Sequence, residues 1–118
     1  MPASYAAIWT YPWDLLDEGL DVSLARIAEA GLDTISLAVS YHAGMALLPH
    51  NPKARLRFLE DGAWYLRPSA ETLAGLAIQP RLSALADDQD PLARITEAAA
   101  RHGLQVVAWT ICNHNSWQ

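Results

Sequence analysis

The segment GLDTISLAVSYH, residues 31–42, decides the fold, because a close counterpart, GLQVVAWTICNH, occupies residues 103–114. In each segment a glycine is followed by a continuous run of apolar and β-branched residues, and a histidine follows 11 residues after the glycine. Such runs are typical of strands that are buried on both faces of a parallel sheet. The repeat therefore predicts two parallel strands, at 32–41 and 104–111.

A helix is expected before each of these strands. Residues 21–30 carry apolar side chains at helical spacing, with Asp21 as the expected N-cap. Residues 91–102 follow the same pattern after Asp90, and the proline at position 91 suits the first position of a helix. Each helix is expected to end at the glycine of the repeat. A short apolar run at 4–10, stopped by a proline, supplies a further strand.

The insertion between the two units, residues 43–89, interrupts the repeat. Its clearest local signal is Asp61-Gly62, which lies between the alternating stretches RLRFLE and AWYLR. An Asp-Gly pair suits a two-residue hairpin turn, because both central residues of that turn need positive φ angles. We therefore expect a β-hairpin over 55–67. Residues 73–88 are expected to form a loop.

These elements predict an α/β fold, a partial (β/α)8 (TIM) barrel with about three parallel strands, two main helices and a β-hairpin insertion after the second strand. Residues 1–118 are expected to be a single domain. Residues 103–118 contain no charged residue, so a sheet of three strands would leave an apolar edge open. We therefore expect the N-terminal portion of a longer barrel chain, with self-association through the exposed edge strand. The alternative is a small three-layer domain completed by the hairpin and by dimerisation.

Composition argues against several classes of function. The net charge is −5 and the eight lysines and arginines form no run, which argues against nucleic-acid binding. The single cysteine, Cys112, excludes an internal disulfide framework and a cysteine-rich zinc site. The sequence has neither a signal-peptide pattern nor an apolar run of membrane-spanning length, so we expect a cytoplasmic protein with no membrane partner. We expect no cofactor, because the chain lacks GxGxxG and phosphate-binding loop motifs.

Two longer segments carry a family resemblance. SYHAGMALLPHNPKARLRFLEDGAWYLRP, residues 40–68, and HGLQVVAWTICNHNS, residues 102–116, resemble the N-terminal part of uncharacterised bacterial proteins with a glycoside-hydrolase-like (β/α)8 barrel. The resemblance covers most of the chain but only about the first three of the eight strands of such a barrel. It implies a barrel fold and, by analogy of fold, carbohydrate hydrolysis.

A ligand-binding rim is expected where the three strands end, because ligands of parallel barrels bind at the carboxyl ends of the strands. Aromatic faces pack on the C–H faces of sugars, while asparagine and histidine bind hydroxyl groups, so we expect a carbohydrate or another small molecule. The alternative role for these tryptophans and histidines is structural, in the barrel core or in hydrogen bonds at strand ends. The expected rim residues are Trp9, Tyr11, Trp13, Asp14, Tyr41, His42, Trp109, Asn113, His114 and Asn115.

The catalytic residues cannot be identified from the sequence. Glycoside hydrolysis normally needs two carboxyl groups, and of the 13 acidic residues only Asp14 follows the end of an expected strand. The missing carboxylate is expected on later strands, so this chain alone is expected to be inactive. One alternative is a metal-dependent sugar isomerase or epimerase barrel with His42 and His114 near a divalent cation, although the chain has no HxH, HExxH or CxxC motif. The other alternative is a non-catalytic binding module.

Overall fold

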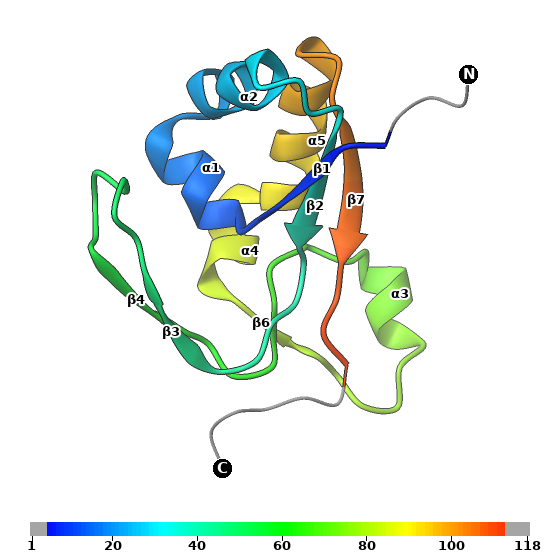
Figure 1. Ribbon diagram of the computed structural model, residues 1–118. Coiled ribbons are helices and arrows are strands. Elements are labelled where there is room, and N and C mark those ends of the chain that lie inside the picture. Colours follow the sequence, from blue (N-terminus) through cyan, green and yellow to red (C-terminus); the bar gives the residue numbers. More distant parts are fainter. Residues whose placement is uncertain (1–4, 113–118) are drawn as a thin grey trace.

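Three strands form a parallel sheet in the computed structural model, which describes residues 5–112 (Figure 1). They are β1 (Ala7–Thr10), β2 (Thr34–Ala38) and β7 (Gln105–Trp109), in the order β1-β2-β7. Ser36 of the central strand pairs with Trp9 on one side and with Val107 on the other. The parallel strands alternate with helices along the chain, which confirms the predicted α/β class and both glycine-led strands.

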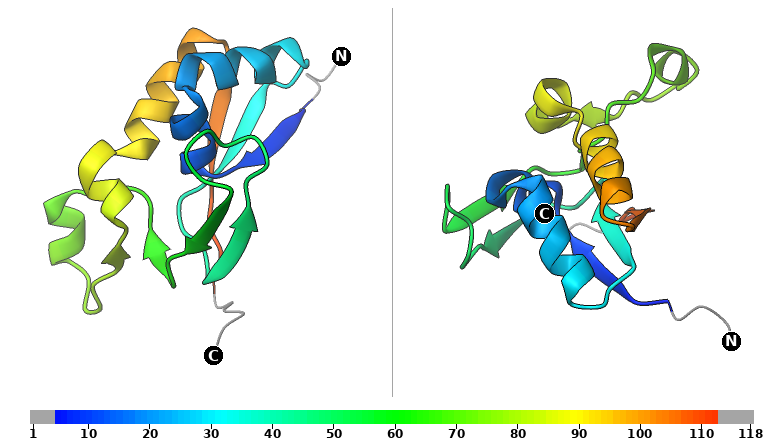
Figure 2. Two further views of the ribbon diagram at one scale, coloured as in Figure 1. Left: turned by 90° about the vertical axis from the view of Figure 1, so that its left-hand side faces the viewer. Right: turned by 90° about the horizontal axis from the view of Figure 1, so that it is seen from above.

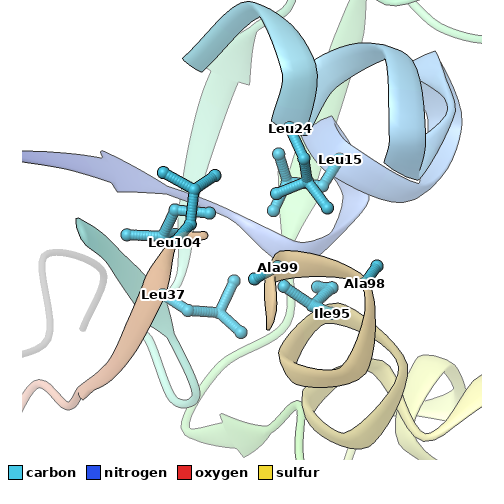
Figure 3. Packing of buried hydrophobic residues seen from close by; sticks show 8 residues of the cluster. Leu15, Leu24, Leu37, Ile95, Ala98, Ala99 and Leu104 are labelled. Atoms are coloured by element: carbon cyan, nitrogen blue, oxygen red, sulfur yellow. The ribbon is translucent and has the colours of Figure 1, made fainter. Parts of the chain in front are cut away.

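Three helices cover one face of this sheet (Figures 1 and 2). They are α1 (Pro12–Glu18), α2 (Leu20–Glu29) and α5 (Pro91–Arg101). Because successive strand residues point to opposite faces, alternate residues of β2 point toward these helices. Figure 3 shows the resulting core, in which leucines of α1 and α2 meet apolar residues of α5 and of the sheet. Its buried members are Leu15, Leu24, Ile35, Leu37, Ile95, Ala98, Ala99 and Leu104.

The opposite face of the sheet combines small central residues with large outer ones. Ser36 and Ala38 of β2 are buried, whereas Trp9 of β1 is 74% exposed. The indole rings of Trp9 and Trp109 stack with their centroids 5.5 Å apart, although the central strand separates β1 from β7. Small side chains on β2 leave room for this contact, and the two rings in turn shield the central strand.

The first residues of α2 and α5 bear on the two predicted N-caps, of which one is wrong and the other is at the predicted position. The N-cap position of α2 is held by Gly19, with φ 97°, so the prediction of Asp21 as the N-cap is wrong. The Asp21 carboxylate instead accepts hydrogen bonds from His102 Nε2 at 3.0 Å and from Arg101 at 3.4 Å, which ties the start of α2 to the end of α5. At the start of α5, Asp90 occupies the predicted cap position with φ 41°, but its side chain makes no capping hydrogen bond.

The insertion pairs its strands differently from the prediction. The strand β4 (Leu56–Leu59) pairs antiparallel with β3 (Gly44–Leu47), whereas β5 (Ala63–Trp64) pairs in parallel with β6 (Arg81–Leu82). The prediction of a hairpin over 55–67 is therefore wrong, because the observed hairpin is formed by β3 and β4. A turn does occur at Gly62, with φ 59°, but Asp61 lacks the positive φ that a two-residue hairpin turn also requires.

Two short helices extend into the region expected to be loop, residues 73–88. They are α3 (Ala70–Ala74) and α4 (Ala84–Gln89), and each begins at a serine cap. Ser69 Oγ accepts a hydrogen bond from the Thr72 amide at 3.1 Å, and Ser83 Oγ accepts one from the Leu85 amide at 3.2 Å. Within residues 5–112, none of the helices has the length and apolar character needed to cross a bilayer.

Candidate functional site

Aromatic side chains from all three strand ends converge at the carboxyl edge of the parallel sheet. The Tyr11 ring lies 5.2 Å from the Tyr41 ring, edge to face, and 6.1 Å from the Trp109 ring. Tyr41 and Trp109 are themselves 5.4 Å apart, and Trp9 extends the group by stacking on Trp109. Four of the predicted rim residues are therefore brought together. We call Trp9, Tyr11, Tyr41 and Trp109 the aromatic platform.

Trp13 lies beneath the platform rather than at its surface. Its buried ring stacks on Tyr11 with the centroids 4.7 Å apart and meets Tyr65 edge to face at 5.3 Å. The guanidinium of Arg57 lies 4.6 Å from the centroid of the Trp13 ring, within the range of a cation–π interaction. Burial raises the pKa of Tyr65 to about 12. Trp13 therefore supports Tyr11 from below, which is the structural role that the sequence left open for it.

A pocket opens beside Tyr11, between α1 and the loop that joins β3 to β4. Asp14 and Glu18 lie four residues apart on α1, so they share one helix face, and both line the pocket. Leu47 and His50 line it from the hairpin side. Sequence reasoning missed Glu18 because it selected residues close to the strand ends, and Glu18 lies eight residues beyond the end of β1. The four-residue spacing of the two acids would have revealed it once 12–18 was recognised as a helix.

The electrostatics of the pocket differ from those of an open surface. Burial raises the pKa of the Asp14 carboxyl, and the nearby carboxylates of Glu18 and Asp17 raise it further, while a hydrogen bond with the Tyr11 backbone and the charge of Arg57 oppose the rise. Burial also raises the pKa of the Tyr11 hydroxyl, which lies beside Tyr41. Shifted groups that gather in a cleft are typical of binding and catalytic sites. A carboxyl that keeps its proton to a higher pH than usual can both donate and accept hydrogen bonds there.

The loop wall of the pocket is fastened to α1. Asn51 Nδ2 donates to Asp17 at 2.9 Å, while Asn51 Oδ1 accepts from the amides of Lys53 and Ala54 at 2.8 and 3.0 Å. Lys53 Nζ donates to the second Asp17 oxygen at 2.8 Å. Partial burial raises the pKa of Asp17, but the hydrogen bonds from Asn51 and Lys53 outweigh it, so the pKa is lowered overall. The pocket wall is therefore held in place without a ligand.

The other predicted rim residues divide into two groups. His42 lies at the same edge of the sheet, where its ring is 4.3 Å from the Tyr41 ring and its Nδ1 is 2.6 Å from the Ala43 carbonyl oxygen. The expected closeness of two rim histidines stays a prediction, because one of them lies outside the described residues. In residues 5–112, no group of three or more His, Cys, Asp or Glu is arranged to hold a metal ion. Outside the described residues lie Asn113, His114 and Asn115.

The arrangement joins a partly exposed aromatic surface to a pocket with carboxyl groups, and Tyr11 belongs to both. Such a site can pack on a flat apolar face of a ligand and hydrogen-bond its polar groups at the same time. No family model, curated protein or solved structure matches the chain. The case for a function therefore rests on the geometry of the site.

Proposed function

We propose that this chain binds a carbohydrate at the carboxyl edge of its parallel sheet, as the N-terminal part of a glycoside-hydrolase-like (β/α)8 barrel. The observation that carries the proposal is the exposed indole of Trp9, stacked on Trp109 in the platform that adjoins the carboxyl-lined pocket. Aromatic faces pack on the C–H faces of sugar rings, and carboxylates accept hydrogen bonds from hydroxyl groups. One oligosaccharide can therefore contact both parts of the site.

The barrel part of the proposal is supported by topology. Neighbouring parallel strands with helices on one face correspond to a section of a barrel wall, whose other face would point to the barrel interior. The bulky Trp9 and Trp109 and the small Ser36 share that other face. In barrels of this kind the ligand site lies at the carboxyl ends of the strands, where the platform is found.

We propose binding without turnover for residues 1–118. Asp14 and Glu18 project from one face of one helix, whereas glycoside hydrolysis uses two carboxyl groups that flank the scissile bond. A ligand in the pocket would meet both carboxyl groups from the same side. They are therefore suited to holding hydroxyl groups, and we do not assign them the roles of acid and nucleophile.

Isothermal titration calorimetry with a panel of monosaccharides and oligosaccharides tests this proposal. Trp9→Ala should weaken binding about 2- to 12-fold, the equivalent of roughly 0.5–1.5 kcal/mol for a lost aromatic stacking contact. The matched control is Phe58→Ala, which removes another exposed aromatic side chain, from the hairpin away from the platform. It should leave the affinity unchanged.

The pocket is tested in the same titrations by Glu18→Gln, which keeps the shape of the side chain and removes its charge. It should weaken binding, whereas Glu71→Gln on the exposed helix α3 should not. Absence of binding to every sugar at millimolar concentration, or equal losses for Trp9→Ala and Phe58→Ala, would contradict the proposal. Binding that requires a divalent cation would favour the isomerase class instead.

A further inference from the structure

The pocket beside Tyr11 is small and has two unlike walls. Its volume is about 230 Å³, which lies below the roughly 300 Å³ at which pockets for drug-sized ligands begin. One wall is α1, with the carboxyl groups of Asp14 and Glu18, and the other is the loop between β3 and β4, with Leu48 and Pro49. The pocket is therefore large enough for one sugar ring and too small for two.

The two walls of the pocket are joined at one end. Asn51 lines the pocket and donates a hydrogen bond at 2.9 Å to Asp17, the last residue but one of α1. Lys53 Nζ donates to the same carboxylate at 2.8 Å. The junction therefore lies near the C-terminal end of α1, whereas Tyr11 lies at its N-terminal end. A chain of sugars in the pocket can continue past Tyr11 but meets the protein at the junction.

The aromatic platform begins at the other end of the pocket. Tyr11 lines the pocket, and its ring lies 6.1 Å from the ring of Trp109. The ring of Trp109 lies 5.5 Å from that of Trp9, which is 74% exposed. Each of these two steps is comparable to the length of one sugar residue in a chain. The rings therefore offer successive contacts to a chain that leaves the pocket past Tyr11.

We propose that the site recognises the end of an oligosaccharide chain, an inference that rests on the proposed carbohydrate binding. The terminal residue occupies the pocket, and the next two residues lie on Trp109 and Trp9. A chain bound through an internal residue would have to leave the pocket at both ends, and the hydrogen bond between Asn51 and Asp17 occupies one of them. The ligand class is therefore short oligosaccharides and chain ends rather than the interior of a polysaccharide.

A series of chain lengths tests the proposal. Isothermal titration calorimetry is carried out with cello-, chito-, malto- and xylo-oligosaccharides of one to six residues. In a series that binds, the affinity should rise from one residue to three and then stay constant, because in residues 5–112 no further ring contacts Trp9. Binding through an internal stretch would instead raise the affinity further, in proportion to the number of registers that a longer chain offers.

Two variants separate the pocket from the platform. Trp9→Ala should reduce the ratio of trisaccharide to monosaccharide affinity roughly 2- to 12-fold, the loss of one aromatic contact. Glu18→Gln should lower both affinities by the same factor and leave that ratio unchanged, because Glu18 lines the pocket that the first residue occupies. The control is Ile78→Ala, which changes a side chain that is 87% exposed and should alter neither affinity.

The outcomes distinguish this inference from the proposed function. Affinity that does not rise beyond the monosaccharide, affinity that keeps rising to six residues, or a ratio that Trp9→Ala leaves unchanged would overturn chain-end recognition while carbohydrate binding stands. Failure of every series to bind at millimolar concentration would overturn both. Circular dichroism checks that each variant is folded, and Trp9→Leu replaces Trp9→Ala if that variant is not.

Discussion

Asp14 lies in the first turn of α1, and burial raises the pKa of its carboxyl. A carboxyl with a higher pKa in the folded than in the unfolded chain stabilises the fold below the unfolded pKa. That contribution is lost as the pH rises through the folded value. Asp14→Asn should therefore increase stability at pH 7, and the gain should vanish near pH 3, below the ordinary aspartate pKa of about 3.9. Urea midpoints at the two pH values measure this. A gain of equal size at both would rule out ionisation as its cause.

The pKa of Asp17 is shifted in the opposite direction, so its contribution to stability depends on pH in the opposite way. Its pKa is lowered by the hydrogen bonds from Asn51 and Lys53, so its contribution is present above the unfolded pKa and is lost as the pH falls through the folded value. Asn51→Ala should destabilise the chain by about 1–3 kcal/mol, because buried hydrogen-bonding groups lose their partner. Lys53→Ala, which removes an exposed cation from the same cluster, should cost no more than about 1 kcal/mol.

Thermal and urea unfolding at pH 7 and pH 3 check this pair of variants. The loss caused by Asn51→Ala should be smaller at pH 3, because that pH lies below the ordinary pKa of 3.8 and part of the contribution of the ionised Asp17 is then lost. A Lys53→Ala variant that is as unstable as Asn51→Ala would show that the salt bridge, rather than the buried amide, holds the loop to α1.

The sequence predicts part of the site residue by residue. Trp9, Tyr11 and Trp109 meet because the carboxyl ends of neighbouring parallel strands lie at one edge, which strand positions alone imply. The places of Trp13 and Glu18 depend instead on the phase of α1, since helical rotation turns one inward and the other toward the pocket. That phase is fixed by packing of α1 against α2 and α5 on one side and against the hairpin region on the other, which strand ends do not reveal.

At the scale of the elements, continuous apolar runs identified the parallel strands because burial on the sheet dictates their composition. The hairpin was missed for a different reason. Asp61-Gly62 is a local signal, whereas the partner of β4 is selected by contacts distant in the sequence, including Arg57 over Trp13. Short helices such as α3 rest on a single serine cap, which apolar periodicity does not detect.

The packing of α2 gives a direct test at this scale. Leu24 is fully buried between α2 and the sheet, so Leu24→Ala should destabilise the chain by about 2–5 kcal/mol through lost burial and a residual cavity. Val22 lies on the same helix but is exposed, so Val22→Ala should change stability by no more than about 0.5 kcal/mol. Urea denaturation measures both, and equal effects would mean that α2 presents another face to the core.

At the scale of the whole molecule, the helices bury one face of the parallel sheet, while two other surfaces within residues 5–112 expose large apolar side chains. One surface is the sheet face with Trp9 and Trp109, and the other is the outer face of the hairpin, which carries Met45, Leu47, Leu56 and Phe58. The two surfaces differ in the groups that surround them. The sheet face adjoins a pocket with carboxyl groups, which suits a polar ligand with apolar faces, whereas the outer face of the hairpin carries apolar side chains on both of its strands.

The central place of β2 also bears on how the chain acquires its structure during synthesis. β1, α1, α2 and β2 are contiguous in sequence, so β1 and β2 can pair soon after residue 38 has left the ribosome. β7 must instead find β2 after residues 39–104 have been made, and contacts between distant segments form slowly. Until then one edge of β2 has no neighbour, and a nascent chain at this stage is open to pairing with foreign strands.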